Sequence, residues 1–244
     1  MKIAVVTGAS YGLGKSICEK LLQNNFKVYG ISRTEPAISN SNLTWIKADL
    51  YNDLNIISLV HKITEKKIDL LVNNAGTHVE EAALSFSQEN FHKIFDLNFI
   101  APIRITKSLS TKLINGLIIN ISSTSDRFAE VGSGLYCASK SALNIYFDAV
   151  ALENKKIKVL TILPDYVDTP LQHKLSDASK DFDWEKCVKP DDIACFIRDV
   201  TNGTYDLKSG ARVIVVNNKA MNATKDPEKL FYYNVDIKKL KKLK

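Results

Sequence analysis

The chain has 244 residues, of which 45% are hydrophobic and 25% charged, and this length and composition favour one large globular domain over a disordered chain. Its four cysteines lie far apart, which argues against a disulfide framework and against a cysteine-based metal site, so we expect reduced thiols, no metal and a cytoplasmic location. The formal net charge is +6, but removing the five lysines of the last seven residues from the 33 Lys and Arg leaves 28 against 27 Asp and Glu.

The basic excess therefore belongs to a tail, residues 237–244, which we expect to be the solvated end of a single domain spanning residues 1–244. The alternative is a tail that binds nucleic acid or a membrane surface, with an affinity that depends on salt and is lost when the tail is deleted. The apolar run after Lys2 is too short for a secretory signal or a membrane span. We expect neither a nucleic-acid partner nor a membrane partner.

Short, almost wholly apolar runs alternate along the chain with longer segments of helical character. The runs that predict strands are Lys2–Thr7, Lys27–Ser32, Ile68–Val72, Gly116–Ser122, Ile157–Leu163 and Ala211–Val216. Strands that are apolar on both faces and separated by helices are typical of a parallel sheet covered on both sides. The pattern predicts an α/β fold, a single-domain, Rossmann-type, doubly wound parallel sheet with helices on both faces.

A glycine-rich turn follows the first predicted strand. Gly8, Gly12 and Gly14 have the spacing G-x-x-x-G-x-G, and a helical pattern runs from Lys15 to Asn25. Glycines let the backbone approach a phosphate closely, and the N–H groups at the start of a helix attract the negative charge of a pyrophosphate. The spacing differs from the commoner G-x-G-x-x-G fingerprint, and a turn alone can require glycine.

The end of the second predicted strand distinguishes the two nicotinamide cofactors. An acidic residue at this position holds the ribose hydroxyl of NAD, whereas arginine accommodates the 2′-phosphate of NADP. Arg33 occupies the position, with the hydroxyls of Ser32 and Thr34 beside it, and the first carboxylate is Glu35. NADP is therefore favoured over NAD, although a solvated loop arginine remains the alternative.

A tyrosine and a lysine four residues apart often occur on a helix by accident, but after the preceding motifs they form a candidate catalytic pair. Tyr136 and Lys140 lie near the start of a helical segment that reaches Asn154, so both side chains share one helix face. A phenol has a pKa of about 10, and a neighbouring lysine cation stabilises its phenolate. Ser123, thirteen residues before Tyr136, directly follows a predicted strand and is placed to hold a substrate oxygen; Ser122 is its neighbouring alternative.

Together these motifs resemble the short-chain dehydrogenase/reductase family over nearly the whole chain to about residue 216. The resemblance extends to Asn73-Asn74-Ala75-Gly76, Asp49-Leu50 and Asn98. It implies that Tyr136 is the general acid or base, that Lys140 lowers its pKa and binds the nicotinamide ribose, that Ser123 orients the substrate oxygen and that Asn98 supports a proton-relay water. The implied reaction is hydride transfer between NADP and a carbonyl or alcohol substrate.

The resemblance also implies a set of cofactor-binding residues. These are Gly8, Ser10, Tyr11, Gly12, Leu13, Gly14, Ser32, Arg33, Thr34, Asp49, Leu50, Asn74, Ala75, Gly76, Tyr136, Lys140, Pro164, Val167 and Thr169. The segment that contains the last three departs from the family at one point, because Asp165 follows Pro164 where glycine is usual. This carboxylate is either a substrate-selecting change or a solvent-facing loop side chain.

The walls of the expected substrate pocket do not identify a substrate. They comprise His78-Val79, Ser125–Val131 and Leu171–Lys189, which mix aromatic, acidic and basic side chains. Arg127 either binds an anionic substrate group or is a solvated loop residue. The family implies a homo-oligomer, a dimer or a tetramer, and the rival function is a regulatory protein that senses NADP without turnover.

Overall fold

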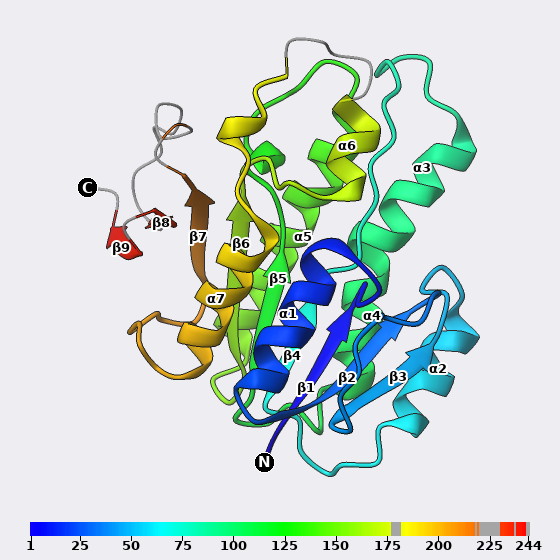
Figure 1. Ribbon diagram of the computed structural model, residues 1–244. Helices are drawn as coiled ribbons and strands as arrows, with labels where there is room; N and C mark the ends of the chain where they lie inside the picture. Colours follow the sequence, from blue (N-terminus) through cyan, green and yellow to red (C-terminus); the bar gives the residue numbers. More distant parts are fainter. Residues whose placement is uncertain (177–181, 218, 220–229, 237, 243–244) are drawn as a thin grey trace.

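The computed structural model describes residues 1–176, 182–217, 219, 230–236 and 238–242, in which one sheet runs through the centre of the molecule (Figure 1). Its strands follow the order β3-β2-β1-β4-β5-β6-β7-β8-β9, and all neighbours pair in parallel except β8 and β9. The strands are β1 (Lys2–Thr7), β2 (Phe26–Ser32), β3 (Leu43–Lys47), β4 (Leu70–Asn73), β5 (Leu117–Ile121), β6 (Lys158–Pro164), β7 (Ala211–Val216), β8 (Leu230–Asn234) and β9 (Lys239–Lys242). This arrangement confirms the predicted fold class.

Each of the six predicted strands is present with ends that differ by up to two residues, and three further strands were not predicted. Within the described residues β3 pairs only with β2, and Ile46 is its only buried residue, so it lacks the continuous apolar run of an inner strand. β8 and β9 extend the sheet beyond β7. All three lie toward the two ends of the sheet, where an apolar run is not required.

Helices cover both faces of the sheet. The helices are α1 (Gly12–Gln23), α2 (Asp53–Lys62), α3 (Gln88–Phe95), α4 (Ala101–Leu109), α5 (Gly134–Glu153), α6 (Pro170–Ser176) and α7 (Pro190–Thr201). In Figure 1, α1 and α7 lie in front of the sheet and α4 and α5 behind it.

Two apolar cores result from the alternation of side chains along the strands. Ala4 and Val6 of β1 pack into the core beneath α1 and α7, whereas Val5 packs into the core formed with α2, α4 and α5. Successive strand residues point to opposite faces, so a strand that is covered on both sides must be apolar at every position. The apolar runs of the sequence therefore report burial on both faces.

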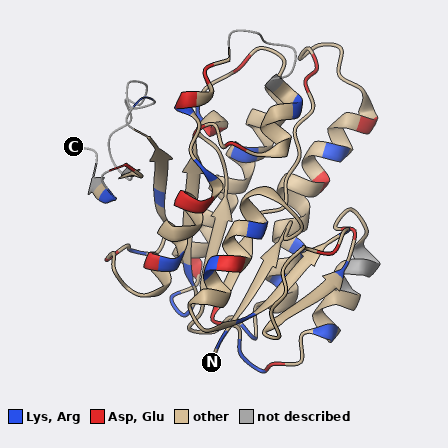
Figure 2. Ribbon diagram, in the orientation of Figure 1, with Lys and Arg blue, Asp and Glu red and all other residues tan. Residues whose placement is uncertain are grey.

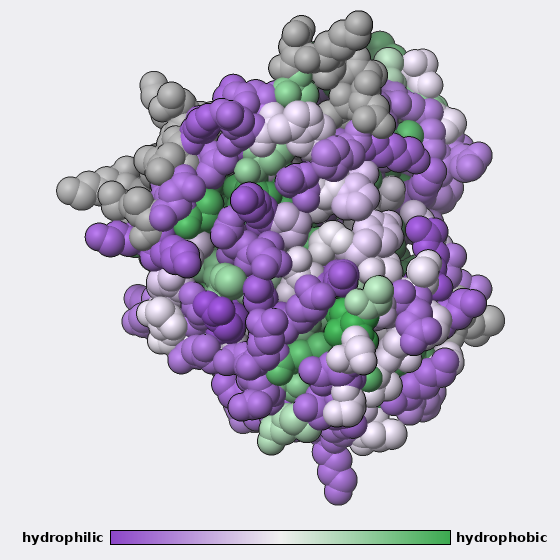
Figure 3. Space-filling view, in the orientation of Figure 1, coloured by the Kyte–Doolittle hydropathy of each residue, from purple (hydrophilic) through white to green (hydrophobic). Residues whose placement is uncertain are grey.

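Polar residues dominate the outside of the molecule. On the face shown in Figure 2, acidic and basic residues are interspersed over the helices and loops. Figure 3 shows the same face as mostly hydrophilic, with hydrophobic residues visible in small patches. No helix in the described part of the chain is both long enough and apolar enough to span a membrane.

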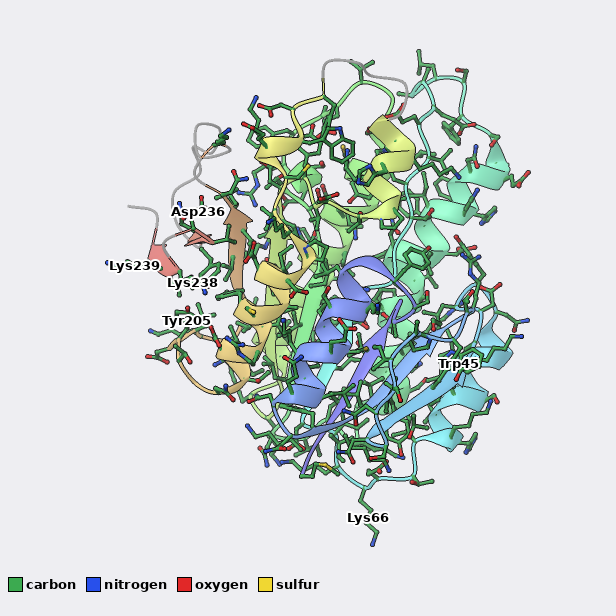
Figure 4. All side chains as sticks on the ribbon, viewed as in Figure 1. Trp45, Lys66, Tyr205, Asp236, Lys238 and Lys239 are labelled. Carbon is green, nitrogen blue, oxygen red and sulfur yellow. The ribbon has the colours of Figure 1, made fainter. Side chains whose placement is uncertain are left out.

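Part of the lysine-rich tail belongs to the sheet. We expected residues 237–244 to be a solvated end, but Lys239–Lys242 form β9, which pairs antiparallel with β8. Lys238 and Lys239 are exposed at this side of the molecule, far from Trp45 on β3 (Figure 4). Residues 237, 243 and 244 lie outside the described residues, so the expectation of a free tail is corrected only for the paired segment.

Candidate active site

A cleft of about 1430 Å³ opens along the carboxyl ends of the parallel strands. It is centred where the chain order reverses, since β1 pairs with β2 on one side and with β4 on the other, and ligands of open α/β sheets bind at such a switch point. Every residue predicted from the sequence to bind the cofactor lines this cleft, and so does Ser123. Asn98 lies behind the wall and is buried.

The glycine turn after β1 is closed tightly. Gly8 has a φ of +69° and Gly12 a φ of +55°, values that residues other than glycine rarely adopt. A Cβ added at Gly14 would lie 2.0 Å from the carbonyl oxygen of Gly8. The backbone can pass this close to itself only because Gly14 has no side chain.

The start of α1 is suited to bind an anion. The residue at its N-cap, Tyr11, makes no side-chain hydrogen bond to the first turn, and that turn contains no acidic residue. The amide groups at the start of a helix carry a partial positive charge and point toward whatever lies beyond its end. The turn and the helix therefore fit a pyrophosphate, as the sequence predicted.

Thr7, which the sequence argument missed, joins the glycine turn to the segment after β4. Its hydroxyl oxygen accepts hydrogen bonds from the backbone N–H groups of Asn74 (2.9 Å) and Ala75 (3.0 Å). The Asn74 side chain in turn donates to the carbonyl oxygens of Thr7 (2.9 Å) and Gly8 (3.4 Å). Two walls of the cleft are thereby locked together, through contacts between residues that are distant in sequence.

At the end of β2, one of the expected hydroxyl donors is already engaged. The hydroxyl of Ser32 donates to the carbonyl oxygen of Thr34 (2.7 Å) and accepts from the Trp45 indole N–H (3.2 Å). Arg33 and Thr34 remain exposed at the rim of the cleft. Any contact with a 2′-phosphate therefore falls to Arg33 and Thr34, not to the hydroxyl of Ser32.

The side chains that the sequence predicts to be catalytic converge at the other end of the cleft. Tyr136 and Lys140 lie on α5, and the Nζ atom of Lys140 is 5.7 Å from the centre of the Tyr136 ring. The side chain of Ser123 lies beside the Tyr136 hydroxyl and lowers its pKa. Ser122, the alternative, has a buried hydroxyl with no hydrogen-bond partner, so the geometry favours Ser123.

Burial controls the protonation of this pair. Desolvation raises the pKa of Tyr136 to about 12 although Ser123 acts in the opposite direction, and it lowers the pKa of Lys140 to about 8. We expected Lys140 to lower the pKa of Tyr136, but desolvation is the larger effect on this phenol. At neutral pH the tyrosine is therefore a neutral phenol that is ready to donate a proton.

Asn98 is fixed by a π-helical turn, Asp96–Ile100, between α3 and α4. Its side chain accepts a hydrogen bond from the Thr77 backbone N–H (2.8 Å) and donates to the Thr77 carbonyl oxygen (2.9 Å) and to the Ser139 hydroxyl (3.1 Å). π-helical turns often occur at functional sites. A Cβ added at Gly76 would lie 3.3 Å from Asn98 Oδ1 and 3.6 Å from Lys140 Nζ, so both side chains reach the same small space.

The segment after β6 closes the cleft from the other side. Pro164, Val167 and Thr169 line it, and the Thr169 side chain faces Gly12 closely enough to be 3.4 Å from an added Cβ. Asp165 also lines the cleft, but its φ is not positive, so the backbone here does not require glycine. Its carboxylate accepts a hydrogen bond from the Thr124 hydroxyl (3.3 Å).

The pKa of Asp165 is raised, primarily because the carboxylate is desolvated. A raised carboxylate pKa stabilises the fold below the ordinary pKa of about 3.9, and this stabilisation is lost as the pH rises through the folded-state pKa. Asp165→Asn, which keeps an acceptor for Thr124, is expected to raise Tm by a few degrees at pH 7 and to leave it unchanged near pH 3. Differential scanning fluorimetry from pH 3 to 8 measures this, with exposed Asp206→Asn as the charge control. A lower Tm at pH 7 would contradict the expected effect.

A family comparison decides how this constellation is classified. A family model described as short chain dehydrogenase matches residues 2–180. The chain belongs to this family. An uncharacterized oxidoreductase from Staphylococcus saprophyticus is 33% identical over 212 residues, 79% of this chain and 88% of the relative.

Two further short-chain dehydrogenase/reductase relatives extend the comparison. The 3-oxoacyl-(acyl-carrier-protein) reductase FabG of Escherichia coli is 30% identical over 189 residues, 72% of this chain and 78% of the relative. The crystal structure of a short chain dehydrogenase family protein from Francisella tularensis matches with a TM-score of 0.81 and 27% identity, covering 88% of this chain and 96% of that one. The chain is thus an oxidoreductase of the short-chain dehydrogenase/reductase family with the fold of its relatives.

The substrate walls of this family member differ from expectation at one basic residue. Arg127 neither lines the cleft nor extends into solvent, because its side chain is mostly buried in an ion pair with Asp126 (2.8 Å). Asp126 also accepts a hydrogen bond from Asn144 (2.7 Å), which holds the ion pair inside the protein. Both interpretations of Arg127 drawn from the sequence are therefore wrong.

His78 lies against the tyrosine, a contact that the sequence did not reveal. Its ring stacks on Tyr136 with 4.4 Å between centroids, and its Nε2 atom is hydrogen-bonded to the Ser133 hydroxyl (3.0 Å). Burial lowers the pKa of His78, so a neutral imidazole covers this face of the tyrosine. The part of the expected segment Leu171–Lys189 that lines the cleft comprises Leu171, Gln172, Lys174, Leu175 and Phe182, while residues 177–181 lie outside the described residues.

Proposed function

We propose that this protein is an NADP-dependent oxidoreductase that transfers hydride between the nicotinamide ring and a small carbonyl or alcohol substrate. The observation that carries the proposal is the single cleft that joins the glycine turn, Arg33 and the cluster of Ser123, Tyr136 and Lys140. The residues fit the cofactor because an uncapped helix start, a turn kept narrow by its glycines and a basic rim at Arg33 all line the same cleft. When bound, NADP supplies the nicotinamide ring that exchanges hydride with the substrate.

The side chains of the cleft supply the proton and the orientation. Tyr136 donates its proton to the substrate oxygen during carbonyl reduction and accepts one during alcohol oxidation. Ser123, which already contacts the tyrosine hydroxyl, holds the substrate oxygen beside it. The Lys140 ammonium, which donates to the carbonyl oxygen of Ile121 (3.0 Å), stabilises negative charge on the tyrosine and binds the ribose. Asn98 holds the relay that returns the proton.

The cofactor preference is tested by fluorescence titration with NADPH and NADH. The wild type is expected to bind NADPH at least tenfold more tightly, about 1.4 kcal/mol, because Arg33 pairs with the 2′-phosphate. Arg33→Ala is expected to weaken NADPH binding by that factor and to leave NADH binding unchanged. Equal affinities for the two cofactors in the wild type would overturn the NADP assignment.

Turnover is tested with a panel of aldehydes, ketones and 3-oxoacyl thioesters under NADPH oxidation. A substrate-dependent loss of absorbance at the NADPH band supports an oxidoreductase of carbonyl compounds. Tight NADPH binding without turnover on any carbonyl would favour the rival function, a regulatory protein that senses NADP. A homo-oligomer and a cytoplasmic location complete the proposal and rest on the family resemblance.

A further inference from the structure

A chain of hydroxyl groups leads from Ser123, beside Tyr136, to a carboxylate at the rim of the cleft. The Ser123 side chain interacts with the Tyr136 hydroxyl and lowers its pKa, the Ser123 hydroxyl donates to the Ser125 hydroxyl (3.1 Å), and the Ser125 hydroxyl donates to Glu130 Oε1 (2.8 Å). A hydroxyl has one hydrogen to donate, so the hydrogens of both serines point toward the carboxylate.

The two ends of this chain lie in different surroundings. Ser125 is buried, with 7% of its surface exposed, whereas Glu130 is exposed at the rim of the cleft. A buried hydroxyl therefore links the desolvated tyrosine to a carboxylate that exchanges protons with water.

The loop that carries Glu130 is held in place. The Ser133 backbone N–H donates to the Glu130 carbonyl oxygen (3.0 Å), and the Glu81 N–H donates to the Gly132 carbonyl oxygen (2.9 Å). The Ser125 N–H also donates to the Ser123 hydroxyl (3.1 Å), which fixes the two serines relative to each other. The arrangement thus depends on backbone contacts as well as on the hydroxyl groups.

We infer that Ser125 and Glu130 form a second proton route for this enzyme, in which Ser123, Ser125 and Glu130 connect Tyr136 to solvent. The inference rests on the proposed function. In alcohol oxidation, the Tyr136 proton moves to Ser123 while Ser123 passes its own to Ser125 and Ser125 passes its own to Glu130. The phenolate that remains accepts the substrate proton, and Glu130 releases one proton to water.

Carbonyl reduction uses the same groups in reverse. Tyr136 gives its proton to the substrate oxygen, the hydroxyl groups of Ser123 and Ser125 turn inward, and protonated Glu130 supplies the replacement through them. One proton enters from water for each proton that the substrate receives, so the cycle balances. Several titratable side chains interact electrostatically with Glu130: His78, Tyr136, Cys137, Asp165 and Tyr166.

Two substitutions interrupt the route with little change of shape. Ser125→Ala removes the middle hydroxyl but keeps the backbone N–H that Ser123 accepts from. Glu130→Gln keeps an oxygen that accepts from Ser125 but cannot bind and release a proton. Glu80→Gln is the matched control, because Glu80 is also an exposed carboxylate of the cleft and makes no contact with the serines.

The experiment measures kcat and KM from pH 6 to 9 on the best carbonyl of the panel, at low buffer and with added imidazole. Ser125→Ala and Glu130→Gln are expected to lose tenfold or more in kcat at low buffer with KM within threefold, and to recover most of the loss with imidazole, which can deliver a proton to the cleft. Glu80→Gln and the wild type are expected to be independent of the buffer.

Each other outcome overturns the inference at a different level. Unchanged kcat in both variants removes the second route while leaving the proposed function intact. A loss of kcat that imidazole does not restore, with Tm and NADPH affinity preserved, assigns the two residues a positioning role only. Absence of any wild-type turnover overturns the proposed function, and the route with it.

Discussion

Tyr136→Phe is expected to lower kcat for NADPH-dependent carbonyl reduction by roughly 10²–10⁴-fold, the range that a positioned proton donor contributes. The reason is specific, because the pKa of Tyr136 is raised to about 12, so at pH 7 the side chain beside Ser123 is a neutral phenol with a proton to donate. Phenylalanine keeps the ring that stacks on His78, 4.4 Å between centroids, so the wall of the cleft is preserved. Stopped-flow and steady-state rates on the same carbonyl measure the loss.

The control for this substitution is Tyr146→Phe. Tyr146 also lies on α5, but it is 38% exposed and only packs edge-on against Phe99 and Phe147, contacts that phenylalanine retains. Its turnover should match that of the wild type, and NADPH affinity should stay within threefold in both variants. Turnover of Tyr136→Phe within twofold of the wild type would show that another group donates the proton.

Gly14→Ala is expected to abolish tight NADPH binding and to destabilise the fold. The added Cβ would lie 2.0 Å from the Gly8 carbonyl oxygen and 2.6 Å from Asn74 Nδ2, so the turn must open and its bonds to the segment after β4 must break. Overpacking of this kind costs about 1–3 kcal/mol, which lowers Tm by several degrees in a chain of this length. Fluorescence titration is expected to show at least a hundredfold weaker binding.

Gly134→Ala provides the matched control, since a Cβ there meets only the Ala83 methyl group at 3.7 Å at the start of α5. It should bind NADPH normally and keep its Tm within a degree or two. If Gly14→Ala behaved in the same way, the close passage of the backbone at Gly14 would not be required for the cofactor site.

Short sequence motifs predicted the parts of the site whose geometry depends only on residues close together in the sequence. A glycine turn between a strand and a helix, and a tyrosine and a lysine one helical turn apart, are set by a few consecutive residues and by the periodicity of the helix. Arg127 shows where such reasoning stops, because its partner Asp126 is adjacent in sequence but the burial of the pair depends on Asn144 and Arg212. Nothing near Arg127 in the sequence reveals this enclosure.

Contacts between distant segments could not be predicted for the same reason. The Thr7 hydroxyl accepts hydrogen bonds from two backbone amides that are 67 and 68 residues away. The Trp45 indole on β3 donates a hydrogen bond to the Ser32 hydroxyl on the neighbouring strand β2. Ser125 and Glu130 are close in sequence, yet their importance depends on where Ser123 and Tyr136 lie in space. The hydrogen-bond partners of these polar groups are set by the tertiary structure. The pattern of hydrophobic residues in the sequence does not indicate which residues those partners are.

The last strand decides how the sheet ends. Among the residues that the structure describes, β9 pairs only with β8, and its other edge presents backbone N–H and C=O groups to which a strand of another molecule could add. Its sequence, Lys239-Leu240-Lys241-Lys242, places three positive charges on these four residues. A second copy approaching edge to edge would bring like charges together, so repulsion opposes growth of the sheet into a continuous ribbon. The excess of lysines at this edge therefore opposes aggregation through strand pairing. The repulsion is strongest at low ionic strength and becomes weaker as salt screens the charges.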